Sequence, residues 1–257
     1  MNSYNIIAET TENTVVSEYE PLKRKSDAYQ SEAELEAEFI RMLEEQGYGR
    51  LNIHTEQDLT ANLRIQLEKL NNYTFTNAEW DRFFKNSIAN PNEHILEKTR
   101  KIQEDYIQVL KRDDGSSRNI KLIDKGNIHN NSLQVLNQYT VSKNDGARHD
   151  NRYDVTVLVN GFPLVHMELK RRGVAIKEAF NQIDRYQRDS FWAGSGLFEY
   201  VQIFVISNGT NTKYYSNTTR ELHINSKTKK TSNTFEFTSY WADQHNNPIT
   251  DLMDFAR

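Results

Sequence analysis

The fold is decided by two alternating segments and the turn that joins them, RYDVTVLVNGFPLVHMELK at residues 152–170. Apolar and polar residues alternate on both sides of the turn, which predicts strands at Tyr153–Val159 and Leu164–Lys170 because successive side chains of a strand point to opposite faces. Asn160 and Gly161 between them form a typical hairpin turn signal. The stretch therefore predicts an antiparallel β-hairpin.

The second strand of this hairpin carries ionisable side chains on one of its faces. Glu168 and Lys170 are two residues apart and share that face with His166, whereas the apolar residues between them point into the core. An ionisable pair at the end of an apolar strand is costly to bury unless the protein uses it. Glu168 and Lys170 are therefore candidate functional residues.

The register of the hairpin decides whether Asp154 joins this pair. A two-residue turn would place Asp154 opposite Met167, on the wrong face. A three-residue loop places it opposite Glu168 instead, and Val157 then pairs with Val165 on the apolar face. Because burial and chemistry agree on the second register, we predict the three-residue loop or an equivalent β-bulge.

Two carboxylates that converge with little else to neutralise them predict a site for a hard divalent cation. Mg²⁺ suits such a site, because it accepts one or two carboxylates together with water and phosphate oxygens. The metal would polarise a phosphate and lower the pKa of its bound water, and Lys170 could orient the attacking water. Asp154, Glu168 and Lys170 are thus the predicted catalytic residues of a phosphodiester hydrolase.

The chain upstream of the hairpin shows helical periodicity. A capping box that begins at Ser31 predicts a helix at about 32–46, and apolar spacing predicts another at 58–71. A second capping box at Thr76 and the segment 93–103 predict two more. We expect the middle helices, at about 55–105, to be an insertion that decorates a core.

Downstream of residue 106 the period changes to two, with one helix predicted at Val174–Arg188. We expect an α/β fold with a mixed, mostly antiparallel sheet flanked by helices, in the core order αβββαβ. Residues 1–30 are predicted to be irregular, 31–240 to form the domain, 217–234 to be a mobile loop and 241–257 to begin a linker or helix. The further predicted strands are Tyr106–Leu110, Ile120–Asp124, Gln134–Val141, Val201–Ser207 and a short one near Lys213–Tyr215.

Composition narrows the function classes without deciding among them. The chain contains no cysteine, which excludes a disulfide scaffold, a thiolate zinc site and a cysteine nucleophile, and which suits a reducing cytoplasm. No signal peptide and no apolar run of membrane-spanning length are present. The net charge of −4 argues against a surface coated in positive charge, yet local phosphate contacts beside a Mg²⁺ site remain compatible with it.

Two motifs give this pattern a family resemblance. Asp154 followed by Glu168-Leu169-Lys170 resembles the PD-(D/E)xK nuclease signature, with Tyr153 at its variable Pro position. Gln182 and Tyr186 match the QxxxY motif that accompanies this signature in restriction and RecB-like enzymes. The longer segment 151–217 resembles the N-terminal nuclease domain of type I restriction endonuclease R subunits, and weaker similarity extends from Tyr29 to the end of the chain.

The resemblance implies roles for individual residues. Asp154 and Glu168 would be metal ligands, Lys170 the catalytic lysine, and the Leu169 carbonyl would complete the metal shell. Some relatives add a glutamate from the first helix, for which Glu36 is the candidate and Glu32, one turn earlier, the rival. Because they lie four residues apart, Gln182 and Tyr186 share one helix face, where they contact the DNA backbone or steady the catalytic strand.

The resemblance also implies substrate and partners. A Mg²⁺-dependent endonuclease would act on duplex DNA, with modification and specificity subunits as partners. ATP would serve a helicase-like motor that is absent here, since no GxxxxGK[ST] loop occurs. Arg171, Arg172 and Arg185 beside the proposed site favour phosphate contacts. The alternatives are a catalytically silent domain that docks DNA, a subunit-interaction domain, or a surface ion-pair cluster without function.

Overall fold

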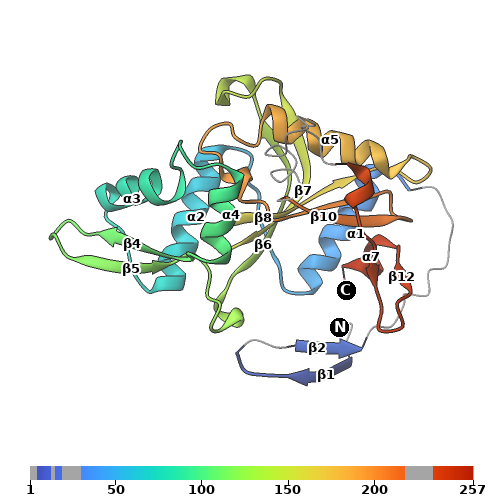
Figure 1. The fold of residues 1–257 in the computed structure, drawn as a ribbon, viewed down its shortest axis with the longest axis horizontal. Coiled ribbons are helices and arrows are strands. Elements are labelled where there is room, and N and C mark those ends of the chain that lie inside the picture. The colour runs from blue at the N-terminus through green and yellow to red at the C-terminus, as the bar shows by residue number, and fades with distance from the viewer. Residues whose placement is uncertain (1–4, 13–14, 19–29, 218–233, 257) are drawn as a thin grey trace, which may run out of the picture.

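The computed structural model describes residues 5–12, 15–18, 30–217 and 234–256. Within these residues, six strands form the main sheet in the order β10-β9-β8-β7-β6-β3 (Figure 1). Neighbours pair antiparallel except β3 with β6 and β8 with β9, which are parallel. The strands are β3 (Gly49–Arg50), β6 (Leu133–Val141), β7 (Asn151–Val159), β8 (Phe162–Leu169), β9 (Ile203–Ser207) and β10 (Thr212–Ser216).

Two helices cover opposite faces of this sheet (Figure 1). Helix α1 (Glu32–Glu45) begins at the predicted Ser31 capping box and buries an apolar stripe against one face. Helix α5 (Ile176–Asp189) packs on the other face, against β8 and β9. The order α1, β6, β7, β8, α5, β9 confirms the expected αβββαβ arrangement and the α/β class with a mixed sheet.

The middle of the chain forms an elaboration beside the sheet, and it is larger than predicted. Strands β4 and β5 form their own two-stranded sheet rather than joining the main one, and they pack against α2 and α3. The insertion therefore extends past residue 105. Its elements are α2 (Glu56–Asn71), α3 (Asn77–Phe83), a π-helical turn (Phe84–Ile88), α4 (Ile95–Gln103), β4 (Ile107–Lys111) and β5 (Ser117–Lys121).

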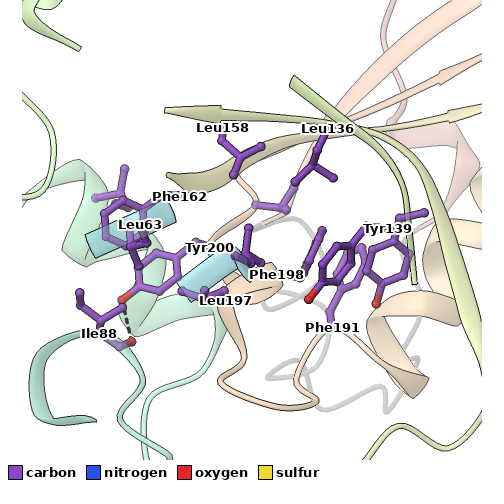
Figure 2. Packing of buried hydrophobic residues seen from close by; sticks show 14 of the residues in the cluster. Leu63, Ile88, Leu136, Tyr139, Leu158, Phe162, Phe191, Leu197, Phe198 and Tyr200 are labelled. Atoms are coloured by element: carbon purple, nitrogen blue, oxygen red, sulfur yellow. Dashed lines mark hydrogen bonds between the residues drawn. The ribbon is translucent and has the colours of Figure 1, made fainter. Parts of the chain in front are cut away.

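The elaboration shares one apolar core with the α5 face of the sheet. Figure 2 shows Leu63 of α2 beside Phe162 and Tyr200, and the Tyr200 hydroxyl donates to the Ile88 carbonyl at 2.9 Å. A Cβ at Gly161 would lie 2.6 Å from the Leu63 Cα, so the hairpin turn needs a glycine where α2 passes. The insertion is thus packed into the domain and braces the hairpin turn.

The hairpin reaches the expected register by a different route. Its turn is Asn160-Gly161, both with positive φ, so the predicted three-residue loop is wrong. A β-bulge next to Val157 supplies the extra residue, and Val157 faces Val165 as expected. The alternative prediction of an equivalent bulge is therefore confirmed.

The N-terminal end differs from expectation, whereas the C-terminal end contains a helix as expected. Residues 1–30 are not wholly irregular, because β1 (Asn5–Glu9) and β2 (Val15–Glu18) pair antiparallel. Strands β11 (Trp241–Ala242) and β12 (Pro248–Ile249) pair near the C-terminal end, and α7 (Leu252–Phe255) packs against α1. The predicted loop at 217–234 lies almost entirely outside the described residues. No helix in the described ranges is both long and apolar enough to span a membrane.

Candidate active site

The three predicted catalytic residues meet just beyond the last paired residues of β7 and β8. Glu168 at the end of β8 is fully buried, and the Lys170 ammonium donates to its Oε1 at 3.1 Å and to the Leu169 carbonyl at 3.0 Å. Asp154 is half-buried on β7, and its Oδ2 accepts a hydrogen bond from the Leu169 N–H at 2.9 Å. The backbone around Leu169 therefore ties both carboxylates and the lysine together.

Burial dominates the electrostatics of the two acids. It raises the pKa of Asp154 to about 7, with a further upward contribution from the Glu168 charge and opposing ones from the Leu169 N–H and Lys170. Burial likewise raises the pKa of Glu168 to about 7, and Lys170 opposes it. Two interacting acids whose ionised forms are this costly would be stabilised by an added positive charge.

Glu168 keeps one oxygen free of protein donors. Its Oε2 has no hydrogen-bond partner among the described residues, and neither has His166 Nε2, which lies 3.8 Å away. Burial lowers the pKa of His166 to about 4, so the ring is neutral, with its Nδ1 3.1 Å from Thr156 Oγ1. Glu168 thus has a buried oxygen with unused acceptor capacity, on the side of His166.

The first helix brings Glu36 close to this site, but its oxygens are engaged. Glu36 is buried, and it accepts hydrogen bonds from Asn137 Nδ2 at 2.6 Å and from Gln138 Nε2. Burial raises its pKa, the two amides oppose this, and the charge on Asp154 adds to the rise. The rival, Glu32, accepts from the Arg171 backbone N–H at 3.2 Å. In the described part of the chain, no three or more His, Cys, Asp or Glu residues cluster as metal ligands.

The QxxxY pair supports the strand that carries Asp154. Gln182 donates to the Tyr186 hydroxyl, which donates in turn to the Arg152 carbonyl at 2.8 Å. Tyr186 is buried, and its ring lies 4.8 Å from the ring of Tyr153, centroid to centroid. Of the two roles that the resemblance implied, steadying the catalytic strand fits Tyr186, because its side chain does not lie on the surface.

The predicted basic residues lie near the site with different exposure. Arg171 and Arg185 are exposed, whereas Arg172 is half-buried. The Arg185 guanidinium lies 5.4 Å from the Tyr186 ring centroid, and its charge lowers the pKa of Glu168. A cavity of about 400 Å³ lies elsewhere, between α4 and residues 192–199, and neither carboxylate lines it.

Sequence reasoning missed two residues that shape the site. Asn137 and Gln138 of β6 both bind Glu36, although neighbouring residues of a regular strand point to opposite faces. Gln138 has a φ of 55°, a left-handed conformation that is uncommon for a residue with a side chain. No local pattern marks it, because its partner is 102 residues away.

The fold and the site define an α/β domain with a mixed sheet, flanked by helices, that carries a buried pair of acids at the end of a hairpin. Residues 29–223 match the family model described as the N terminus of the type I restriction enzyme R protein. Since this match covers more than half of the chain, the protein belongs to that family.

Curated relatives extend the match to nearly the whole chain. The type I restriction enzyme EcoprrI endonuclease subunit of Escherichia coli is 46% identical over 251 residues, which are 97% of this chain and 76% of that protein. Endonuclease subunits of Staphylococcus aureus (strain COL) and Staphylococcus saprophyticus are both 39% identical, over 234 and 233 residues respectively. Those matches cover 89% of this chain but only 23% of either staphylococcal protein.

Proposed function

We propose that this chain is a Mg²⁺-dependent endonuclease domain with the PD-(D/E)xK fold, which hydrolyses phosphodiester bonds of duplex DNA. The observation that carries the proposal is the meeting of Asp154, Glu168 and Lys170 at the end of a buried hairpin. The order of helices and strands supports the fold. The names of the relatives, which describe endonuclease subunits of type I restriction enzymes, support the reaction.

The donor set suits a hard divalent cation. Glu168 offers a buried oxygen without a partner in the described residues, and burial raises the pKa of both acids, so a bound cation would stabilise their ionised forms. Asp154, Glu168 and the Leu169 carbonyl are the proposed ligands, and water and phosphate oxygens would fill the remaining positions, as Mg²⁺ prefers. When bound, Mg²⁺ would polarise the phosphate and lower the pKa of the attacking water.

Lys170 is the proposed catalytic group of the chain itself. Its hydrogen bonds to Glu168 and to the Leu169 carbonyl hold the ammonium beside both proposed ligands. From there it can orient the attacking water and offset the negative charge that develops on the phosphate. Arg171 and Arg185 are exposed, and we propose that they contact flanking phosphates, with Arg172 as a further candidate. Such contacts would bind DNA without reading its bases.

We further propose that the complete protein acts in the cytoplasm with modification and specificity subunits as partners. Unmodified duplex DNA would be translocated by a motor region beyond these 257 residues, since they contain no phosphate-binding GxxxxGK[ST] loop for ATP. Recognition of the DNA sequence would then belong to another subunit, and this domain would respond to backbone geometry.

The test uses the full-length protein assembled with its partner subunits. Asp154→Ala, Glu168→Ala and Lys170→Ala should each lower Mg²⁺-dependent DNA cleavage by roughly 100-fold or more, while ATP-driven translocation continues. Glu178→Ala, which removes an exposed carboxylate from the first turn of α5, is the matched control and should cut normally. If all three site variants cut like the wild type, the domain is a silent DNA-docking or subunit-interaction module instead.

A further inference from the structure

At Gln138, strand β6 departs from regular geometry. Its φ of 55° lies in the left-handed region, which costs free energy for any residue with a Cβ. Such a conformation persists only where the surroundings hold it in place. Gln138 therefore needs a local restraint.

Glu36 on α1 provides that restraint. Its two oxygens accept from the side-chain amides of Gln138 and Asn137, which are consecutive in β6. Only 8% of Glu36 is exposed, and each of its two oxygens accepts one of these amides, so both bonds are shielded from water. One carboxylate thus holds two neighbouring side chains on the same side of the strand, which the alternation of a regular strand would not allow.

The irregularity lies opposite Asp154. The register pairs Asn137 with Val155 and Tyr139 with Tyr153, so Gln138 faces Asp154 across the ladder. The residues before and after this pair are buried on different faces of the sheet. Val155 belongs to the apolar cluster on the α1 side, whereas Tyr139 and Tyr153 belong to the cluster on the α5 side, despite their even spacing.

Asp154 lies at this change of face, and its contacts differ from those of a regular strand residue. The paired residues of β7 and β8 end at Val155 with Met167. Beyond them, the Asp154 carboxylate accepts the Leu169 N–H, so a side chain joins the two strands. The irregular residue of β6 and the carboxylate that joins β7 to Leu169 thus lie at the same level of the sheet.

We infer that Glu36 is a positioning residue, which acts through Gln138 to keep the β6 backbone in the conformation that directs Asp154 toward Leu169 and Glu168. This role differs from that of a metal ligand, which the family resemblance suggested for Glu36. The effect of Glu36 on catalysis rests on the proposed function. Its effect on the β6 backbone and on Asp154 does not.

The experiment compares Glu36→Ala, Gln138→Gly and the double variant Glu36→Ala/Gln138→Gly. Glycine adopts positive φ without a supporting side chain, so it should replace the restraint that Glu36 supplies. Hydrogen exchange of the Leu169 amide, followed by NMR without metal, reports the bond to Asp154. Mn²⁺ affinity and DNA cleavage by the full-length protein report the site.

We expect Glu36→Ala to speed exchange of the Leu169 amide and to weaken Mn²⁺ binding and cleavage by about tenfold, the factor that corresponds to losing support for one left-handed residue. The double variant should recover Mn²⁺ binding and cleavage to within roughly threefold of wild type. Asn246→Ala is the matched control, because it strains an exposed left-handed position in the β11–β12 turn. It should leave the Leu169 amide and Mn²⁺ binding unchanged.

Two results would overturn the inference. In the first, the Leu169 amide is unaffected by Glu36→Ala. In the second, the double variant restores this amide while Mn²⁺ binding stays as weak as in Glu36→Ala, which would make Glu36 a ligand. Should Glu36→Ala fail to fold, Glu36→Gln keeps the shape and one acceptor oxygen, and it should give a smaller loss with the same rescue. Failure of the proposed function is separate, because Asp154→Ala would then leave Mn²⁺ binding intact.

Discussion

Asp124 and Glu168 are both buried carboxylates, yet their surroundings have opposite effects on them. Asp124 follows β5, and its oxygens accept from the backbone N–H groups of Gly126 and Asn127, from Asn130 Nδ2 and from Lys121 Nζ, at 3.0–3.2 Å. The Asn130 amide, together with these other donors, lowers the pKa of Asp124 to about 2. The loop therefore stabilises this carboxylate in its charged form.

Glu168 has the reverse balance. Lys170 is its hydrogen-bond donor, its second oxygen has no partner among the described residues, and burial raises its pKa to about 7. The comparison teaches that burial by itself does not indicate function. A carboxylate whose donors are complete organises a loop, whereas one with unused acceptor capacity and a perturbed pKa is typical of a site that binds something else.

The largest expected effect is a difference in metal binding between variants of the two acids. Glu168→Gln should weaken Mn²⁺ binding by roughly 100-fold or more, because a proposed ligand loses its charge. Asp124→Asn should leave it unchanged. Isothermal titration of both variants makes the measurement, and equal losses would show that the distinction between the two carboxylates is mistaken.

The stability of the domain, unlike metal binding, should depend on Asp124. Asp124→Asn should destabilise the domain by about 1–3 kcal/mol at pH 7, because buried donors of the loop lose a charged acceptor. The stabilising contribution of Asp124 is present above pH 4 and is lost as pH falls toward 2, since its folded pKa lies below the usual 3.8. Urea unfolding at pH 7 and pH 3 measures this, and a variant difference that grows on acidification would contradict it.

The site acids should give the metal-free protein a second pH dependence. Their folded pKa of about 7 lies above the ordinary 3.8 and 4.5, so the folded state binds protons more tightly. Stability, and with it Tm, should therefore fall as pH rises from about 4.5 to about 7. Thermal melts with and without Mg²⁺ test this, because the cation should remove the decline.

A smaller effect is expected for Tyr186, which supports β7. Tyr186→Phe removes the hydroxyl that joins Gln182 to the Arg152 carbonyl and should cost about 0.5–1.5 kcal/mol. Cleavage should fall less than tenfold, since the carboxylates stay in place. A loss as large as that of Glu168→Gln would mean that Tyr186 contacts the substrate.

The amino-acid sequence by itself determined the elements whose signals are local. Alternation over 152–170 predicted the hairpin, and the capping boxes at Ser31 and Thr76 both form in the structure. The pairing of Asp154 with Glu168 followed from the requirement that apolar residues share one face. These features depend on neighbours within a few residues or one turn, so the pattern of residue types is sufficient to specify them.

Only the tertiary structure decided how the site is held. The short parallel strand β3 depends on a partner strand about 85 residues away, and the separate β4–β5 sheet depends on packing against α2 and α3. The left-handed Gln138 depends on a carboxylate 102 residues earlier in the chain. Local propensity opposes such a conformation, and it forms because long-range hydrogen bonds outweigh that local cost once the helix and the sheet are packed together.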